Sequence, residues 1–214
     1  MGIQKEGKGA AFRRIWDLAG TAVMLNILFL LCCLGVVTIG PGLCGLYSAV
    51  RYMIRGDQWS AGFKEGFCTN FLRKMIVGTI FLAVDAYLIF NFAATVYYMQ
   101  DGQLGSVIML GLITAMTLMI SVSLVPAAVY IPTDLTQWLR NGVSLAFSAP
   151  LQTFFTAVLL WFPGVLAFFR IEYAMMLAIV FIAAYFTLIG FLSTLLLKDP
   201  LIKLKNANEA AENT

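Results

Sequence analysis

The chain has 214 residues, of which 61% are hydrophobic and 12% are charged; it contains no histidine, and its net charge is +3. A soluble domain is typically about a quarter charged, whereas this chain has uncharged stretches of about 20 residues, the length that crosses a hydrocarbon core of about 30 Å. The composition excludes an ordinary soluble protein and predicts a polytopic integral membrane protein. Because the basic residues flank apolar segments, as topology signals do, the positive charge does not indicate a nucleic-acid partner.

Apolar segments follow one another along the chain and predict one all-α membrane domain over residues 1–206. The domain is a helical bundle of five long spans, one short return helix and one interfacial amphipathic helix. In chain order we expect helices at about 15–37, 42–55, 59–73, 75–99, 106–130, 151–169 and 173–197, with 42–55 as the return helix and 59–73 as the interfacial one. Residues 207–214 are polar and predict a disordered tail.

The break at Gly40-Pro41-Gly42 decides the topology. If residues 36–56 formed a loop between two spans, with the N-terminus inside, five of the 14 Lys and Arg residues would lie inside and nine outside. If the chain turns at these three residues and re-enters the membrane, 13 lie inside and one outside. Lys and Arg concentrate on the cytoplasmic side, so the second arrangement is favoured, with both termini in the cytoplasm. Pro41 also suits the first turn of a returning helix, where its missing N–H would be unpaired.

The predicted interfacial helix carries an aromatic residue at every fourth position. These residues are Trp59, Phe63, Phe67 and Phe71. Such a face is typical of a helix lying in the headgroup plane, and it is equally compatible with packing against the protein's own loops. The segment FKEGF at 63–67 resembles LRNGV at 139–143, which also precedes a span, so both are candidates for short interfacial helices.

Four basic residues near this helix form a candidate surface for anionic lipid or for the acidic surface of a cytoplasmic partner. They are Arg55, Lys64, Arg73 and Lys74. The alternative interpretation, which we favour, is that these residues serve only as topology signals.

Three polar residues within the apolar segments form a candidate intramembrane site. Asp85 lies near the middle of the 75–99 span, where an ionised carboxylate is costly and often functional. It could bind a proton or cation, or be a structural residue hydrogen-bonded to Asn26, Thr38 or a tyrosine; the structural role is favoured. For Asn26 and Asn91 the commoner role is an interhelical hydrogen bond, worth about 1 kcal/mol.

The residues that carry most catalytic and cofactor chemistry are missing from the sequence. It has no histidine, and its four cysteines form no C-x-x-C pair, which disfavours zinc and haem sites. It also has no phosphate-binding glycine loop and no nucleophile elbow. We therefore expect no enzyme activity, no metal and no cofactor.

Residues 14–18 (RIWDL), 31–41 (LCCLGVVTIGP) and 54–56 (IRG) resemble the YesL-like family, a bacterial group of integral membrane proteins with a domain of unknown function. The match is ordered over residues 12–75 and looser beyond, and Gly35 stands where the family has proline. The resemblance implies a multi-pass protein of the bacterial cell membrane. It also implies an association with carbohydrate utilisation, because such genes often neighbour those of sugar-uptake transporters.

Two functions follow as hypotheses. The first is a non-catalytic accessory or scaffold protein linked to carbohydrate uptake, with permease subunits of a sugar importer as partners in the lipid bilayer. The alternative is a small transporter or channel, assembled as a homo-oligomer, that uses the intramembrane Asp85.

Overall fold

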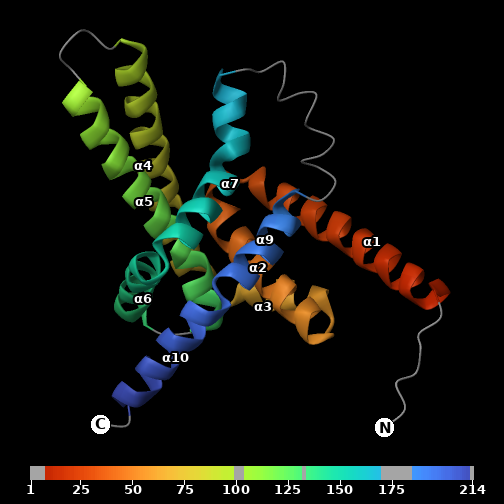
Figure 1. Cartoon of the computed structure of the whole chain (residues 1–214). Coiled ribbons are helices and arrows are strands. Elements are labelled where there is room, and N and C mark those ends of the chain that lie inside the picture. Colours follow the sequence, from red (N-terminus) through yellow and green to blue (C-terminus); the bar gives the residue numbers. More distant parts are fainter. Residues whose placement is uncertain (1–7, 99–103, 132–133, 170–184, 213–214) are drawn as a thin grey trace.

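Every element is a helix in the computed structural model, which describes residues 8–98, 104–131, 134–169 and 185–212 (Figure 1). In chain order the helices are α1 (Lys8–Cys33), the 3₁₀ turn η1 (Val36–Thr38), α2 (Ile39–Arg55), α3 (Trp59–Cys68), α4 (Phe71–Tyr97), α5 (Leu104–Tyr130), α6 (Leu135–Ser148), α7 (Pro150–Phe169), α9 (Phe186–Leu196) and α10 (Lys198–Glu212). The all-α prediction is confirmed for these ranges.

The described residues contain three to four of the long spans, of which five were expected. Three segments are long and apolar enough to cross a membrane: Trp16–Cys33, Phe71–Tyr97 and Leu104–Tyr130. A fourth results if α6 and α7, which meet at an angle of 105°, form one bent span. The last expected span, 173–197, lies partly outside the described residues, and its described part includes the 11-residue helix α9. The helices define a membrane protein with three to four spans among the described residues.

The return helix α2 forms the centre of the bundle. It contacts α1, α3, α4, α5 and α9, and its residues from Cys44 to Val50 are all buried. With 17 residues it is about 25 Å long, somewhat short of a 30 Å hydrocarbon core. A helix too short to span the hydrocarbon core can still lie at the centre, because it is surrounded by other helices and not by lipid. The bundle is therefore built around the segment that the charge count predicts to turn back.

The turn before α2 lies earlier in the chain than predicted. Helix α1 ends at Cys33, and Val36–Thr38 forms the connection, so Gly40, Pro41 and Gly42 belong to the first turn of α2. The Thr38 hydroxyl donates a hydrogen bond to the Gly35 carbonyl at 2.6 Å, which stabilises the connection. The two glycines have a packing role instead: a methyl group on Gly40 would lie 2.5 Å from the Lys74 carbonyl oxygen on α4.

Helix α3 packs directly on α2 through small residues. A methyl group on Gly66 would lie 2.5 Å from the Cys44 carbonyl oxygen, and Phe63 lies against Gly45. The expected helix 59–73 is divided, because Asn70 adopts a left-handed conformation (φ 52°) and α4 begins at Phe71. The aromatic face was predicted to lie either in the headgroup plane or against the protein itself. Phe63 of this face packs in the core beside α2.

Helix α6 repeats this arrangement with α5, although it was absent from the expected set of spans. A methyl group on Gly142 would lie 2.4 Å from the Leu124 side chain, and the Trp138 indole N–H donates to the Leu124 carbonyl at 2.7 Å. The similarity of segments 63–67 and 139–143 therefore has a structural counterpart. In each case a short helix with a glycine in close contact precedes a long helix.

The C-terminal segment is helical to Glu212, in contrast to the disordered tail predicted from residue 207. Leu201 is buried beside α6, and the Asn208 side chain donates to Asn141 Oδ1 at 3.1 Å. Lys205 and Glu209 form an i,i+4 ion pair at 3.6 Å. These contacts hold a polar segment that would have little reason to fold by itself.

A cavity lined by one face of α4 as the candidate functional site

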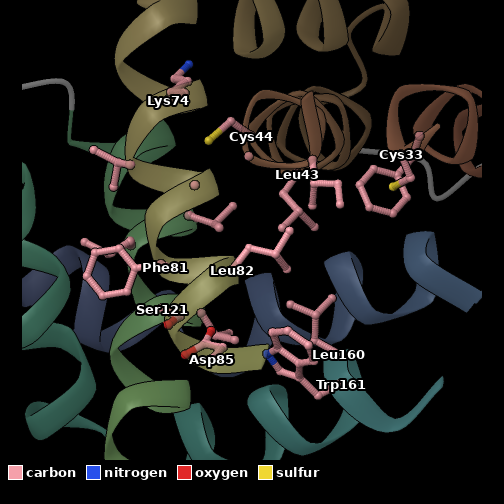
Figure 2. A pocket seen from close by; sticks show the side chains of 18 of the residues that line it. Cys33, Leu43, Cys44, Lys74, Phe81, Leu82, Asp85, Ser121, Leu160 and Trp161 are labelled. Carbon is pink, nitrogen blue, oxygen red and sulfur yellow. The ribbon is translucent and has the colours of Figure 1, made fainter. Parts of the chain in front are cut away.

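A cavity of about 330 Å³ lies between α4 and its neighbours (Figure 2). Its walls come from α1, α2, α4, α5, α7 and α9, and α6 contributes Trp138. Most lining side chains are apolar, and the polar exceptions are few. We call it the α4 cavity and define it by Lys74, Phe81, Asp85, Ser121 and Trp161, which it brings together.

One face of α4 forms a continuous wall of the cavity. The residues on it are Lys74, Val77, Gly78, Phe81, Leu82 and Asp85, which follow a spacing of three and four. This spacing places side chains on one side of an α-helix. Lys74 and Asp85 are 11 residues apart, so they share this face at a separation of about 16 Å along the axis. Figure 2 shows them at opposite ends of the cavity.

Asp85 is the buried acidic group of the cavity. Only 2% of its surface is exposed, and its Oδ1 atom accepts no hydrogen bond from the described residues. The Ser121 hydroxyl is its hydrogen-bonding neighbour, and that hydroxyl also lies 2.9 Å from the Thr117 carbonyl oxygen. A hydroxyl has one hydrogen, so Ser121 can accept from a neutral Asp85 while donating to Thr117, or turn and donate to a carboxylate. The site can therefore satisfy one oxygen of Asp85 in either protonation state.

Lys74 lies inside the protein and not on its basic surface, which corrects the prediction for this residue. Its exposed fraction is 7%, and its ammonium group donates to the Gly66 carbonyl of α3 at 2.6 Å. The cause is its position on the inward face of α4. Gly66 lies in the last turn of α3, where carbonyls lack partners within the helix, so Lys74 caps α3.

The two asparagines predicted with Asp85 lie elsewhere. Asn26 is fully buried, and its Oδ1 accepts the N–H of Phe186 at 3.0 Å, which joins α1 to the start of α9. Asn91 donates to the carbonyl of Tyr87 within its own helix at 2.8 Å. Neither residue lines the α4 cavity. The three intramembrane polar residues are thus three separate features, and the partner of Asp85 is Ser121, which the sequence analysis did not propose.

Of the other three residues of the predicted basic surface, Arg55 and Lys64 are exposed and Arg73 is half-buried. Arg55 ends α2, Lys64 lies on α3, and Arg73 lies in the first turn of α4. The contact between the Tyr52 hydroxyl and the Glu65 carboxylate holds α2 and α3 together at this place. No group of three or more metal-ligating side chains occurs in the described part of the chain.

Sequence reasoning missed Lys74, Ser121 and Trp161 as members of the site. A signal for Lys74 is present, because a separation of 11 residues from Asp85 places both on one helix face. Ser121 lies on α5 and Trp161 on α7. Their proximity to Asp85 depends on how the helices pack, which no local pattern encodes.

The helices and the cavity define a helical membrane protein. Residues 22–92 match the sequence profile of the family described as "Protein of unknown function, DUF624". The predicted resemblance to the YesL-like family, the known group with this domain, is thereby confirmed. Comparisons with curated proteins and with solved structures gave no match. The matched segment contains α2, α3 and the whole inward face of α4, whereas Ser121 and Trp161 lie outside it.

Proposed function

We propose that this protein is a non-catalytic accessory or scaffold protein of the bacterial cell membrane, linked to carbohydrate uptake. The link to carbohydrates comes from the gene neighbourhood that the YesL-like family implies. Permease subunits of a sugar importer are the proposed partners, and both termini are proposed to lie in the cytoplasm.

One observation supports a docking role most directly. The short helices α3, α6 and α10 lie toward the same end of the molecule, away from the end where α4 finishes and α5 begins (Figure 1). Exposed basic residues gather on these helices and on the adjoining end of α2: Arg55, Lys64, Arg140, Lys198, Lys203 and Lys205. The half-buried Arg73 lies nearby, in the first turn of α4. A basic surface of this kind attracts acidic partner surfaces and anionic headgroups.

The experiment is copurification of the tagged protein from membranes of sugar-induced native cells. We expect a permease subunit with the wild type, and loss of that subunit when Arg55→Glu and Lys64→Glu are combined. The charge-preserving pair Arg55→Lys and Lys64→Arg is the matched control and should retain it. Absence of any importer subunit from the wild-type sample, together with normal sugar uptake in a deletion strain, would reject the proposal.

A small oligomeric transporter or channel is the second candidate, and Asp85 favours it. Asp85 lines a cavity between helices, and its Oδ1 accepts no hydrogen bond from the described residues. Intramembrane acidic groups of this kind often mark ion and substrate paths. Flux into proteoliposomes and growth on sugars test this candidate. If Asp85→Asn leaves both unchanged, the candidate loses the residue on which it rests.

A further inference from the structure

We propose that the α4 cavity binds an organic cation with an apolar, preferably aromatic body, and that Asp85 is its counter-ion. This goes beyond the accessory role, which depends on the basic surface at the other end of α4. A carrier role for the protein would require such binding and, in addition, movement of the ligand across the membrane.

The charge distribution in the cavity selects a cation. Asp85 is 2% exposed and has an oxygen without a donor among the described residues. The cavity's basic side chain, Lys74, is about 16 Å away along α4 and donates to the Gly66 carbonyl. A carboxylate in an apolar site needs a partner of opposite charge or a strong donor. A cation bound beside Asp85 would supply the partner of opposite charge.

The walls suit the apolar part of such a ligand. Aromatic residues from five helices line the cavity: Phe29, Phe81, Trp138, Trp161 and Phe186. Figure 2 shows Trp161 at the same end of the cavity as Asp85. Aromatic faces attract organic cations through their quadrupole, most strongly those of tryptophan, and they also bury the ligand's apolar surface.

Size and polarity exclude the other obvious small ligands. A volume of about 330 Å³ is at the small end of ligand pockets, roughly 300–1,000 Å³. Lys74, Asp85 and Ser121 are the main hydrogen-bonding side chains of the lining, too few for the many hydroxyls of a sugar. An anion would meet the Asp85 carboxylate. An uncharged acyl chain would fit the walls and leave the Asp85 carboxylate without a counter-charge.

Equilibrium binding of radiolabelled 3-phenylpropyltrimethylammonium to the purified full-length protein tests the proposal. We expect saturable binding, with affinity roughly tenfold or more weaker in Asp85→Asn, as for loss of a charge-assisted contact. Asp199→Asn changes an exposed aspartate on α10 and should bind as the wild type does. Trp161→Leu should weaken binding while keeping the preference for the cation. Wild-type affinity in Asp85→Asn would overturn the proposal.

A second measurement needs no variant, so a folding defect in Asp85→Asn cannot obscure the result. The cation should raise the Tm of the wild type with increasing concentration, and its anionic analogue 3-phenylpropane-1-sulfonate should not. Equal shifts with both compounds would identify an unselective apolar cavity for lipid chains, and no shift with either would show no binding; both results overturn the proposal. Neither result affects the copurification test of the accessory role.

Discussion

At the residue scale, two basic side chains, the buried Lys74 and the half-buried Arg51, act as helix caps. Lys74 donates to the Gly66 carbonyl near the end of α3. The Arg51 guanidinium donates to the Val129 carbonyl near the end of α5 at 2.9 Å and lies 5.1 Å from the centre of the Tyr130 ring. Terminal carbonyls without helical partners accept such bonds readily, and the helix dipole favours positive charge there.

Replacing Lys74 by methionine tests the first cap. The variant leaves the buried Gly66 carbonyl without this donor, so we expect a loss of about 1–3 kcal/mol in the free energy of unfolding. Lys64→Met removes an exposed lysine from the neighbouring helix and should change stability by less than about 0.5 kcal/mol. Unfolding in detergent is the measurement. Equal stability of the two variants would contradict the proposal that Lys74 stabilises the protein by capping α3.

Arg51→Met should also destabilise the protein by about 1–3 kcal/mol, because the charge-assisted bond to Val129 and the contact with the Tyr130 ring are both lost. Arg55→Met, one turn further along α2, replaces an exposed arginine and serves as the matched control. A common Tm for the two variants would show that Arg51 is no more than a charge at the membrane surface.

At the element scale, glycines determine how closely the helices approach. Gly40 of α2 and Gly78 of α4 lie at one crossing, where a methyl group on Gly78 would be 2.7 Å from the Gly40 Cα. Gly66 and Gly142 have the same role where α3 meets α2 and α6 meets α5. Small residues allow backbones to approach in membrane bundles, where packing replaces the hydrophobic effect.

Gly78→Ala is therefore expected to destabilise the protein by about 1–3 kcal/mol, because the new methyl group meets backbone that cannot move aside. Gly20→Ala on α1 is the control: a methyl group there meets no atom within 4 Å, and alanine is the better helix former. Thermal unfolding of the two variants gives the comparison. A Gly78→Ala protein as stable as Gly20→Ala would mean that α2 and α4 are further apart than described.

The helical elements could be largely predicted from hydrophobicity, whereas their ends could not. The sequence predicted a helix at 75–99, and α4 spans Phe71–Tyr97. The turn expected at Gly40-Pro41-Gly42 lies at 34–38 instead, because glycine beside proline suits a crossing and the first turn of a helix as well as a loop. Of the candidate site, Asp85 was predicted from its charge, but its neighbours Ser121 and Trp161 were not.

At the scale of the whole molecule, the topology is open to a direct test with the native cysteines. Cys68 at the end of α3 is exposed, Cys44 is buried, and Cys32 and Cys33 are half-buried. We expect a membrane-impermeant maleimide to label Cys68 in inside-out vesicles and to leave it unlabelled in intact cells. Peptide mass spectrometry identifies the labelled residue, and Cys68→Ser is the control. Labelling of Cys68 in intact cells would reverse the predicted orientation.

The sequence by itself determined the class of protein, the return of the chain into the bundle and the presence of a costly acidic group within a span. These properties follow from the apolar composition of each segment and from the positions of the charged residues along the chain, both of which the sequence shows directly. Tertiary structure alone decided that the short α2 occupies the centre, that Lys74 caps α3 and that Asp85 faces an aromatic cavity. Those outcomes depend on close contacts between residues far apart in the chain, such as Gly40 with Gly78 and Asp85 with Ser121.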